Sequence, residues 1–86
     1  MKKYKVVVSK SAEKNLSKLP SSQIVRIIEV LKSLEINPRP TGCKKLKGFD
    51  SLWRVRIGNY RVVYAIEDVI LLVDVRDVGH RKDIYR

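Results

Sequence analysis

Residues 53–66 read WRVRIGNYRVVYAI, and this stretch predicts two strands joined by a tight turn. Gly58-Asn59, with glycine first, is typical of a two-residue type II′ hairpin turn, which would pair Arg56 with Arg61. Because side chains alternate along a strand, Arg54, Arg56 and Arg61 would share one face. The other face is apolar and should receive the helices; it consists of Trp53, Val55, Ile57, Tyr60, Val62, Tyr64 and Ile66.

Placing Arg56 directly across from Arg61 destabilises a sheet by about several tenths of a kcal/mol, so folding alone does not favour it. A bound anion would offset that repulsion. A second two-residue turn, at Glu67-Asp68, would instead put Asp74 opposite Arg61 as an ordinary salt bridge. That alternative explains one arginine and leaves Arg54 and Arg56 without a structural reason.

The first half of the chain reads as a strand followed by two helices. Residues 4–8 are β-branched enough for a short strand. Ser9 or Ser11 can cap a helix that ends near Leu19, before Pro20. A second helix opens at residues 20–22, and its apolar stripe recurs at three- and four-residue spacing: Ile24, Ile27, Ile28, Leu31 and Leu34. Residues 37–42 (NPRPTG) predict a loop.

The second half reads as strands. Residues 44–47 form a short extended segment, and strands are expected at 52–57, 60–66 and 69–76. The order β-α-α-β-β-β predicts an α+β fold. In it, residues 1–86 form a single domain, with an N-terminal strand and a helical hairpin packed on a mainly antiparallel, twisted four-stranded sheet.

The chain carries 19 lysines and arginines against 9 acidic residues, for a formal charge of +10. Such an excess predicts a polyanionic or acidic partner: nucleic acid, ribosome, membrane surface or acidic protein. Cys43 is the only cysteine, which rules out an internal disulfide and fits a reducing cytoplasm. Neither a signal peptide nor a bilayer-length apolar run is present, so we expect a cytoplasmic protein without a membrane partner.

The last nine residues, VGHRKDIYR, bring the only histidine, further basic residues and a tyrosine toward the end of the sheet. Arginine and lysine hold phosphates, and tyrosine stacks on an unstacked base, so this combination suits RNA. No metal-ligand spacing, phosphate-binding glycine loop or Ser-His-Asp arrangement stands out. We therefore expect neither a metal nor a cofactor.

Three motifs in order then resemble one family: KLKG at residues 45–48, WRVRIGNYRVVYAI at 53–66, and VGHR at 78–81 followed by Ile84-Tyr85. Together with the opening strand and SKSAEKNLSKLP, they make nearly the whole chain similar to the RelE toxins of toxin–antitoxin systems. The resemblance implies a ribosome-dependent endonuclease that cuts mRNA in the decoding (A) site of the 30S subunit and is held inactive by a cognate antitoxin. A toxin–antitoxin hetero-oligomer could also bind operator DNA.

The resemblance assigns roles to individual residues. Its two basic strand positions match Arg54 and Arg56, and its transition-state arginine matches Arg61. A second arginine matches Arg81 and the C-terminal tyrosine matches Tyr85. Lys47 matches a position that contacts RNA, and the remaining candidate RNA-binding residues are Lys44, Lys45, Lys82 and Arg86.

The implied reaction is attack of the RNA 2′-hydroxyl on the adjacent phosphate, which needs no metal. Arg54 and Arg56 stand where the family's best-known members have lysines. A guanidinium has a pKa above about 12 and is a poor general base, so both would act electrostatically. Arg61 would stabilise the phosphorane, His80 or Arg81 would protonate the leaving oxygen, and Tyr85 would stack on or orient the base. The general base stays open.

Two other functions remain possible on the sequence. The ParE toxins share the fold and poison DNA gyrase, but they usually lack the full basic set. A non-catalytic RNA-binding or ribosome-associated module would bind RNA in a salt-sensitive way and produce no new 5′ ends.

Overall fold

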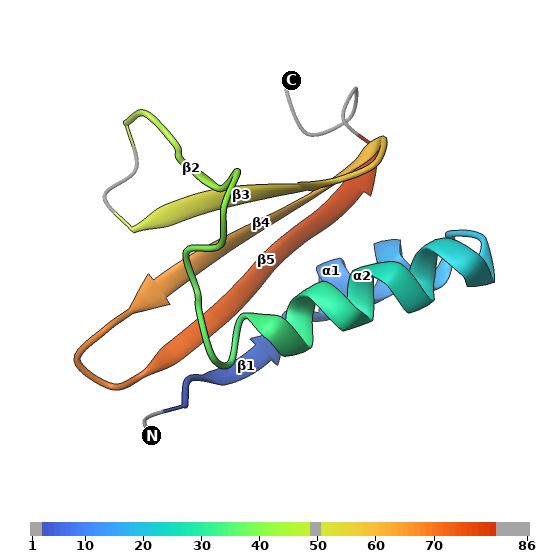
Figure 1. Cartoon of the computed structure of the whole chain (residues 1–86). Coiled ribbons are helices and arrows are strands. Elements are labelled where there is room, and N and C mark those ends of the chain that lie inside the picture. The colour runs from blue at the N-terminus through green and yellow to red at the C-terminus, as the bar shows by residue number, and fades with distance from the viewer. Residues whose placement is uncertain (1–2, 49–50, 81–86) are drawn as a thin grey trace.

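The computed structural model describes residues 3–48 and 51–80, which form one five-stranded sheet and two helices (Figure 1). The elements are β1 (Lys5–Val8), α1 (Lys10–Ser17), α2 (Ser21–Ser33), β2 (Lys44–Lys45), β3 (Leu52–Ile57), β4 (Tyr60–Glu67) and β5 (Leu72–His80). The strand order across the sheet is β1-β5-β4-β3-β2. The α+β prediction is therefore confirmed, with one strand more than expected.

The additional strand is β2, where we expected only a short extended segment. Two residues suffice, because Lys44 pairs with Arg54 and Lys45 pairs with Trp53 on the edge of β3. At the opposite edge, β1 runs parallel to β5, and the other strand pairs are antiparallel. The mainly antiparallel character is thus as predicted.

Both helices begin where the sequence indicates, and α1 ends at Ser17, two residues before the predicted end near Leu19. Ser9 caps α1, since its hydroxyl oxygen accepts the backbone N–H of Ala12 at 3.1 Å. Pro20 stands immediately before α2, where its fixed φ and missing N–H suit a helix start. Across residues 3–48 and 51–80, neither helix combines the length and the apolar content that a membrane span needs.

Both helices lie over the same side of the sheet (Figure 1). Within the predicted stripe of α2, Ile27, Leu31 and Leu34 are buried, whereas Ile28 is 39% exposed. These side chains pack against the predicted apolar face of β3 and β4 and against Val73, Val75 and Val78 of β5. The main apolar core therefore occupies one face of the sheet, and Val63 and Ala65 are buried on the other face.

The β3–β4 hairpin has the predicted register. Ile57 pairs with Tyr60 and Arg56 pairs with Arg61, so the turn contains only Gly58 and Asn59. Gly58 has a φ of +61°, in the left-handed region that favours glycine. The Gly58-Asn59 signal was therefore sufficient to predict the register of this hairpin.

The β4–β5 connection differs from the prediction. Glu67 pairs with Leu72, so four residues (68–71) form the turn and β5 covers 72–80 instead of 69–76. Val69 and Ile70 are 98% and 67% exposed, although their apolar character indicated a strand. Contacts with distant parts of the chain hold this turn, because Asp68 accepts hydrogen bonds from Tyr4 and Arg39. Asp74 consequently lies opposite Ala65 and Arg61 lies opposite Gly79, so the predicted Asp74–Arg61 pairing is wrong.

Candidate functional site

Four cations lie on the face of the sheet away from the helices. Residues directly opposite each other on neighbouring strands point to the same side. The pairing of Lys44 with Arg54, and of Arg56 with Arg61, therefore brings these side chains onto one surface. We call Lys44, Arg54, Arg56 and Arg61 the arginine face. Gly79, opposite Arg61, adds no side chain that would crowd the guanidinium.

The arginines of this face differ in exposure. Arg56 is exposed, whereas Arg54 and Arg61 are only 7% and 4% exposed. Burial lowers the pKa of Arg54, and the neighbouring charge of Arg56 lowers it further. The folded protein thus disfavours the charge on Arg54, and a phosphate would reverse that balance. In a partly desolvated setting a guanidinium also interacts more strongly with an anion than it does in water.

A pocket of about 270 Å³ opens at this face and is lined by Thr41, Gly42, Lys44, Arg54, Val55 and Arg56. Three of its six lining residues are cationic, which makes it suitable for a phosphate group. Thr41 and Gly42 come from the loop between α2 and β2 and were not among the predicted site residues. The only sequence signal was the position of that loop, immediately before β2.

The nearest acidic residues on β5 have partners of their own. Asp74 accepts the Nε–H of Arg76 at 2.8 Å, and Arg76 occupies the irregular position in the β4–β5 pairing. Asp77 accepts a hydrogen bond from the Asn15 side chain on α1 at 3.1 Å. In the described parts of the chain, no group of three or more histidine, cysteine or acidic side chains could hold a metal ion.

His80 lies away from the arginine face. It pairs with Tyr60, which belongs to the helix-covered face, and the two rings meet edge to face with centroids 5.7 Å apart. His80 also lines a second pocket, of about 420 Å³, together with Asn15 of α1 and Lys18, which caps the end of that helix. The structure therefore does not bring His80 together with Arg54, Arg56 and Arg61.

The other predicted residues are spread more widely. Lys45 pairs with Trp53, so it belongs to the side of the sheet opposite Lys44, and Lys47 is exposed just after β2. The remaining candidates, Arg81, Lys82, Tyr85 and Arg86, lie outside the described residues.

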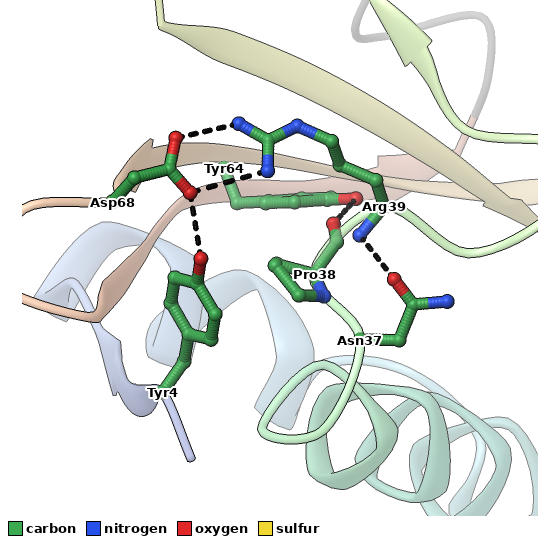
Figure 2. Close-up of polar contacts among 6 residues, drawn as sticks. All are labelled: Tyr4, Asn37, Pro38, Arg39, Tyr64 and Asp68. Carbon is green, nitrogen blue, oxygen red and sulfur yellow. Dashed lines mark hydrogen bonds and ion pairs between the residues drawn. The ribbon is translucent and has the colours of Figure 1, made fainter. Parts of the chain in front are cut away.

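A polar cluster that the sequence did not predict holds the loop beside the pocket (Figure 2). The Tyr4 hydroxyl donates to Asp68 Oδ1 at 2.6 Å, and Arg39 Nη2 lies 2.8 Å from Asp68 Oδ2. The hydrogen bonds from Arg39 and from Tyr4 hold the pKa of Asp68 at about 2. The same contacts raise the pKa of Tyr4 and of Arg39.

Comparison with known proteins identifies the class of fold. A family model described as the ParE toxin of the type II toxin-antitoxin system, parDE, matches residues 6–85. The structure superposes on the archaeal RelE–RelB complex from Pyrococcus horikoshii with a TM-score of 0.83 and 30% sequence identity. That superposition covers 92% of this chain and 96% of the matched chain.

Curated relatives give a consistent result. The putative toxin RelE1 of Methanocaldococcus jannaschii is 35% identical over 98% of this chain and 97% of its own length. The toxin RelE of Mycobacterium tuberculosis is 32% identical over 96% of this chain and 87% of its own length. The chain belongs to the RelE/ParE family of toxins of type II toxin–antitoxin systems.

Proposed function

We propose that this protein is a ribosome-dependent endoribonuclease that cleaves mRNA and thereby inhibits translation in the cytoplasm. One observation carries the proposal: Arg54, Arg56 and Arg61 share the helix-free face of the sheet, with Arg56 directly opposite Arg61. Cross-strand repulsion of this kind destabilises a fold. A polyanionic substrate that binds between these charges would offset the repulsion and so account for the arrangement.

The reaction proceeds by attack of an RNA 2′-hydroxyl on the neighbouring phosphorus. The 2′-oxygen loses its proton and bonds to phosphorus, the bond to the 5′-oxygen breaks, and that oxygen takes up a proton. The products are a 2′,3′-cyclic phosphate and a 5′-hydroxyl. The enzyme has to orient the two oxygens in line and stabilise the additional negative charge on the phosphorane.

Guanidinium groups provide both functions by bidentate contact with phosphate oxygens. We assign Arg54 and Arg56 to holding the phosphate, which also makes the 2′-hydroxyl easier to deprotonate, and Arg61 to stabilising the phosphorane. Since the ring of His80 packs against Tyr60 on the other side of the sheet, Arg81 is the preferred donor to the leaving oxygen. Tyr85 is assigned to stacking on or orienting a base.

The proposed partners follow from the same family. RelE chains have been crystallised with RelB antitoxins from Pyrococcus horikoshii and Methanococcus jannaschii, among others. By analogy, we propose that a cognate antitoxin binds this chain and blocks it, and that the pair can assemble on operator DNA. The charge of +10 supports docking to the RNA-lined A site of the small ribosomal subunit.

Purified ribosomes programmed with a defined mRNA provide the test. Arg61→Ala should slow single-turnover cleavage by about 100-fold or more, the usual effect of removing one transition-state donor. Lys32→Ala, at an exposed position of α2 beside β1, removes one positive charge far from β3 and should leave the rate nearly unchanged. Equal effects of the two substitutions would mean that only the total positive charge matters, and would contradict a specific role for Arg61.

His80→Ala and Arg81→Ala test the assignment of the acid. Arg81→Ala should reduce the cleavage rate more than about ten-fold, within the usual range of general acid catalysis, and His80→Ala should reduce it less. A larger loss of rate in His80→Ala than in Arg81→Ala would assign protonation of the leaving oxygen to His80.

Gyrase poisoning is the second candidate, because the matching family model carries the ParE name. A ParE-like toxin would break DNA and leave ribosome-bound mRNA intact. The two activities are therefore distinguished by which nucleic acid is cut.

A further inference from the structure

One wall of the cationic pocket is a loop that belongs to neither a helix nor a strand. Residues 34–43 connect α2 to β2, and Thr41 and Gly42, in the 37–43 loop of this connection, line the pocket together with Lys44, Arg54 and Arg56. A shift of the loop would therefore change the width of the pocket without moving the arginines. The contacts that hold the loop in place therefore also set the width of the pocket.

The loop is tied to the far end of the sheet through Asp68. Arg39 donates to both carboxylate oxygens of Asp68, with Nη1 at 3.2 Å from Oδ1 and Nη2 at 2.8 Å from Oδ2. The Tyr4 hydroxyl occupies Oδ1 as well, at 2.6 Å (Figure 2). Tyr4 and Arg39, which are far from Asp68 in sequence, thus meet at its carboxylate.

Further contacts press the same loop against the strands that carry the arginines. The Arg39 guanidinium lies 4.9 Å from the ring centroid of Trp53, the residue directly before Arg54. The hydroxyl of Tyr64, which pairs with Trp53, donates to the Pro38 carbonyl at 2.8 Å. The loop therefore takes its place from β3, β4 and the β4–β5 turn together.

Stability alone is a weak explanation for this arrangement. The side chains of Arg39 and Asp68 are 38% and 54% exposed. An ion pair this accessible to water contributes little to folding. Geometry is a better explanation, because a bidentate contact with a third donor fixes direction as well as distance.

We propose that Asp68 is a positioning residue: acting through Arg39, it holds the 37–43 loop where Thr41 and Gly42 complete the pocket for an RNA phosphate. The inference rests on the proposed function for the identity of the ligand. Asp68 itself touches no RNA in this account, and its effect reaches the pocket through the loop.

Asp68→Asn and Asp74→Asn form a matched pair for the test. Each substitution removes one negative charge and weakens an ion pair of 2.8 Å with an arginine. Charge alone predicts that both variants bind RNA more tightly than the wild type. Loop positioning predicts that Asp68→Asn binds a fluorescein-labelled single-stranded RNA about ten-fold more weakly, as if one charge-assisted hydrogen bond were lost, and that Asp74→Asn does not.

An RNA affinity of Asp68→Asn equal to or above that of Asp74→Asn overturns the proposal. Urea titration of both variants confirms that they are folded under the binding conditions. If Asp68→Asn does not fold, Arg39→Lys takes its place, because it keeps the charge and removes only the bidentate contact. Its RNA binding should fall in the same way.

Trp53 supplies a readout that needs no RNA. It is the only tryptophan and lies beneath Arg39, so its fluorescence emission should change in Asp68→Asn and not in Asp74→Asn. Unchanged emission in Asp68→Asn overturns the positioning role even if the protein cleaves RNA. If the emission changes in Asp68→Asn but the wild-type protein binds no RNA, the positioning role is supported and the proposed function is rejected.

Discussion

The two faces of the β3–β4 hairpin are built from alternate residues of the same strands, yet they carry opposite chemistry. On the helix-covered face, Val62 and Tyr64 are completely buried among apolar side chains. On the other face, Arg54, Arg56 and Arg61 stand close together, with like charges opposite each other. The helix-covered face therefore holds the main apolar core, whereas the other face combines three arginines with the buried Val63, which lies directly opposite Arg54.

This comparison predicts that the two faces respond differently to substitution. Truncating an apolar side chain of the helix-covered face that does not contact the 37–43 loop should reduce stability and leave RNA affinity per folded molecule unaltered. On the arginine face, a change at the exposed Arg56 should reduce RNA affinity and leave stability equal or higher.

The largest effect on stability is expected for Ile66→Ala. Ile66 is 4% exposed on the helix-covered face, and truncating such a side chain leaves a cavity. The free energy of unfolding should fall by about 2–5 kcal/mol in urea titration. RNA affinity, measured where the variant is still folded, should match the wild type. A loss below about 1 kcal/mol would mean that this face is not the core.

Tyr64→Phe should have an intermediate effect. It removes the hydroxyl that donates to the Pro38 carbonyl at 2.8 Å in a buried setting. Leaving that acceptor without its donor should lower the free energy of unfolding by about 1–3 kcal/mol. Thermal or urea unfolding measures the loss, and an unchanged midpoint would show that the hydrogen bond contributes little.

Arg56→Gln should change stability in the opposite direction. Removing one of two facing guanidiniums should raise the free energy of unfolding by about 0.2–1 kcal/mol. The same variant should bind single-stranded RNA more weakly, with a slope of log K against log salt reduced by about 0.7. A destabilised variant with an unchanged salt slope would contradict the separation of the two faces.

The smallest effect concerns pH. Because the folded-state pKa of Asp68, about 2, lies below the ordinary value of 3.8, its contacts stabilise the protein when the carboxylate is ionised. That contribution is complete above about pH 4 and is lost as the pH falls toward about 2. The stability difference between wild type and Asp68→Asn should thus be constant near neutral pH and disappear in acid, as urea titrations at several pH values will measure. A difference that persists near pH 2 would exclude the ionised carboxylate as its cause.

The parts of the fold that sequence predicted are those with local signals. Gly58-Asn59 fixes the β3–β4 turn from its own backbone preference, and Ser9 fixes the start of α1. The β4–β5 turn had no such signal. Its Asp68 is held by Tyr4 and Arg39, and Leu71 takes a left-handed φ of +52° in a turn that apolar character had suggested to be a strand.

The residues of the candidate site likewise divide into those that local signals predicted and those that they did not. The common face of Arg54, Arg56 and Arg61 followed from alternation and one turn. Thr41 and Gly42 were missed, because the place of their loop depends on contacts between residues far apart in sequence. His80 was expected in a tail near the arginines, but the longer β4–β5 turn moves it into β5, opposite Tyr60.

The most direct test of the central claim compares the two nucleic acids in cells after induction of the wild-type protein and of Arg61→Ala. Mapping of 5′ ends across translated messages, together with a count of DNA double-strand breaks, covers both possible targets. We predict new mRNA ends inside ribosome-occupied codons with the wild type, a loss of those ends in Arg61→Ala, and no rise in DNA breaks. Intact messages accompanied by DNA breakage would contradict the account.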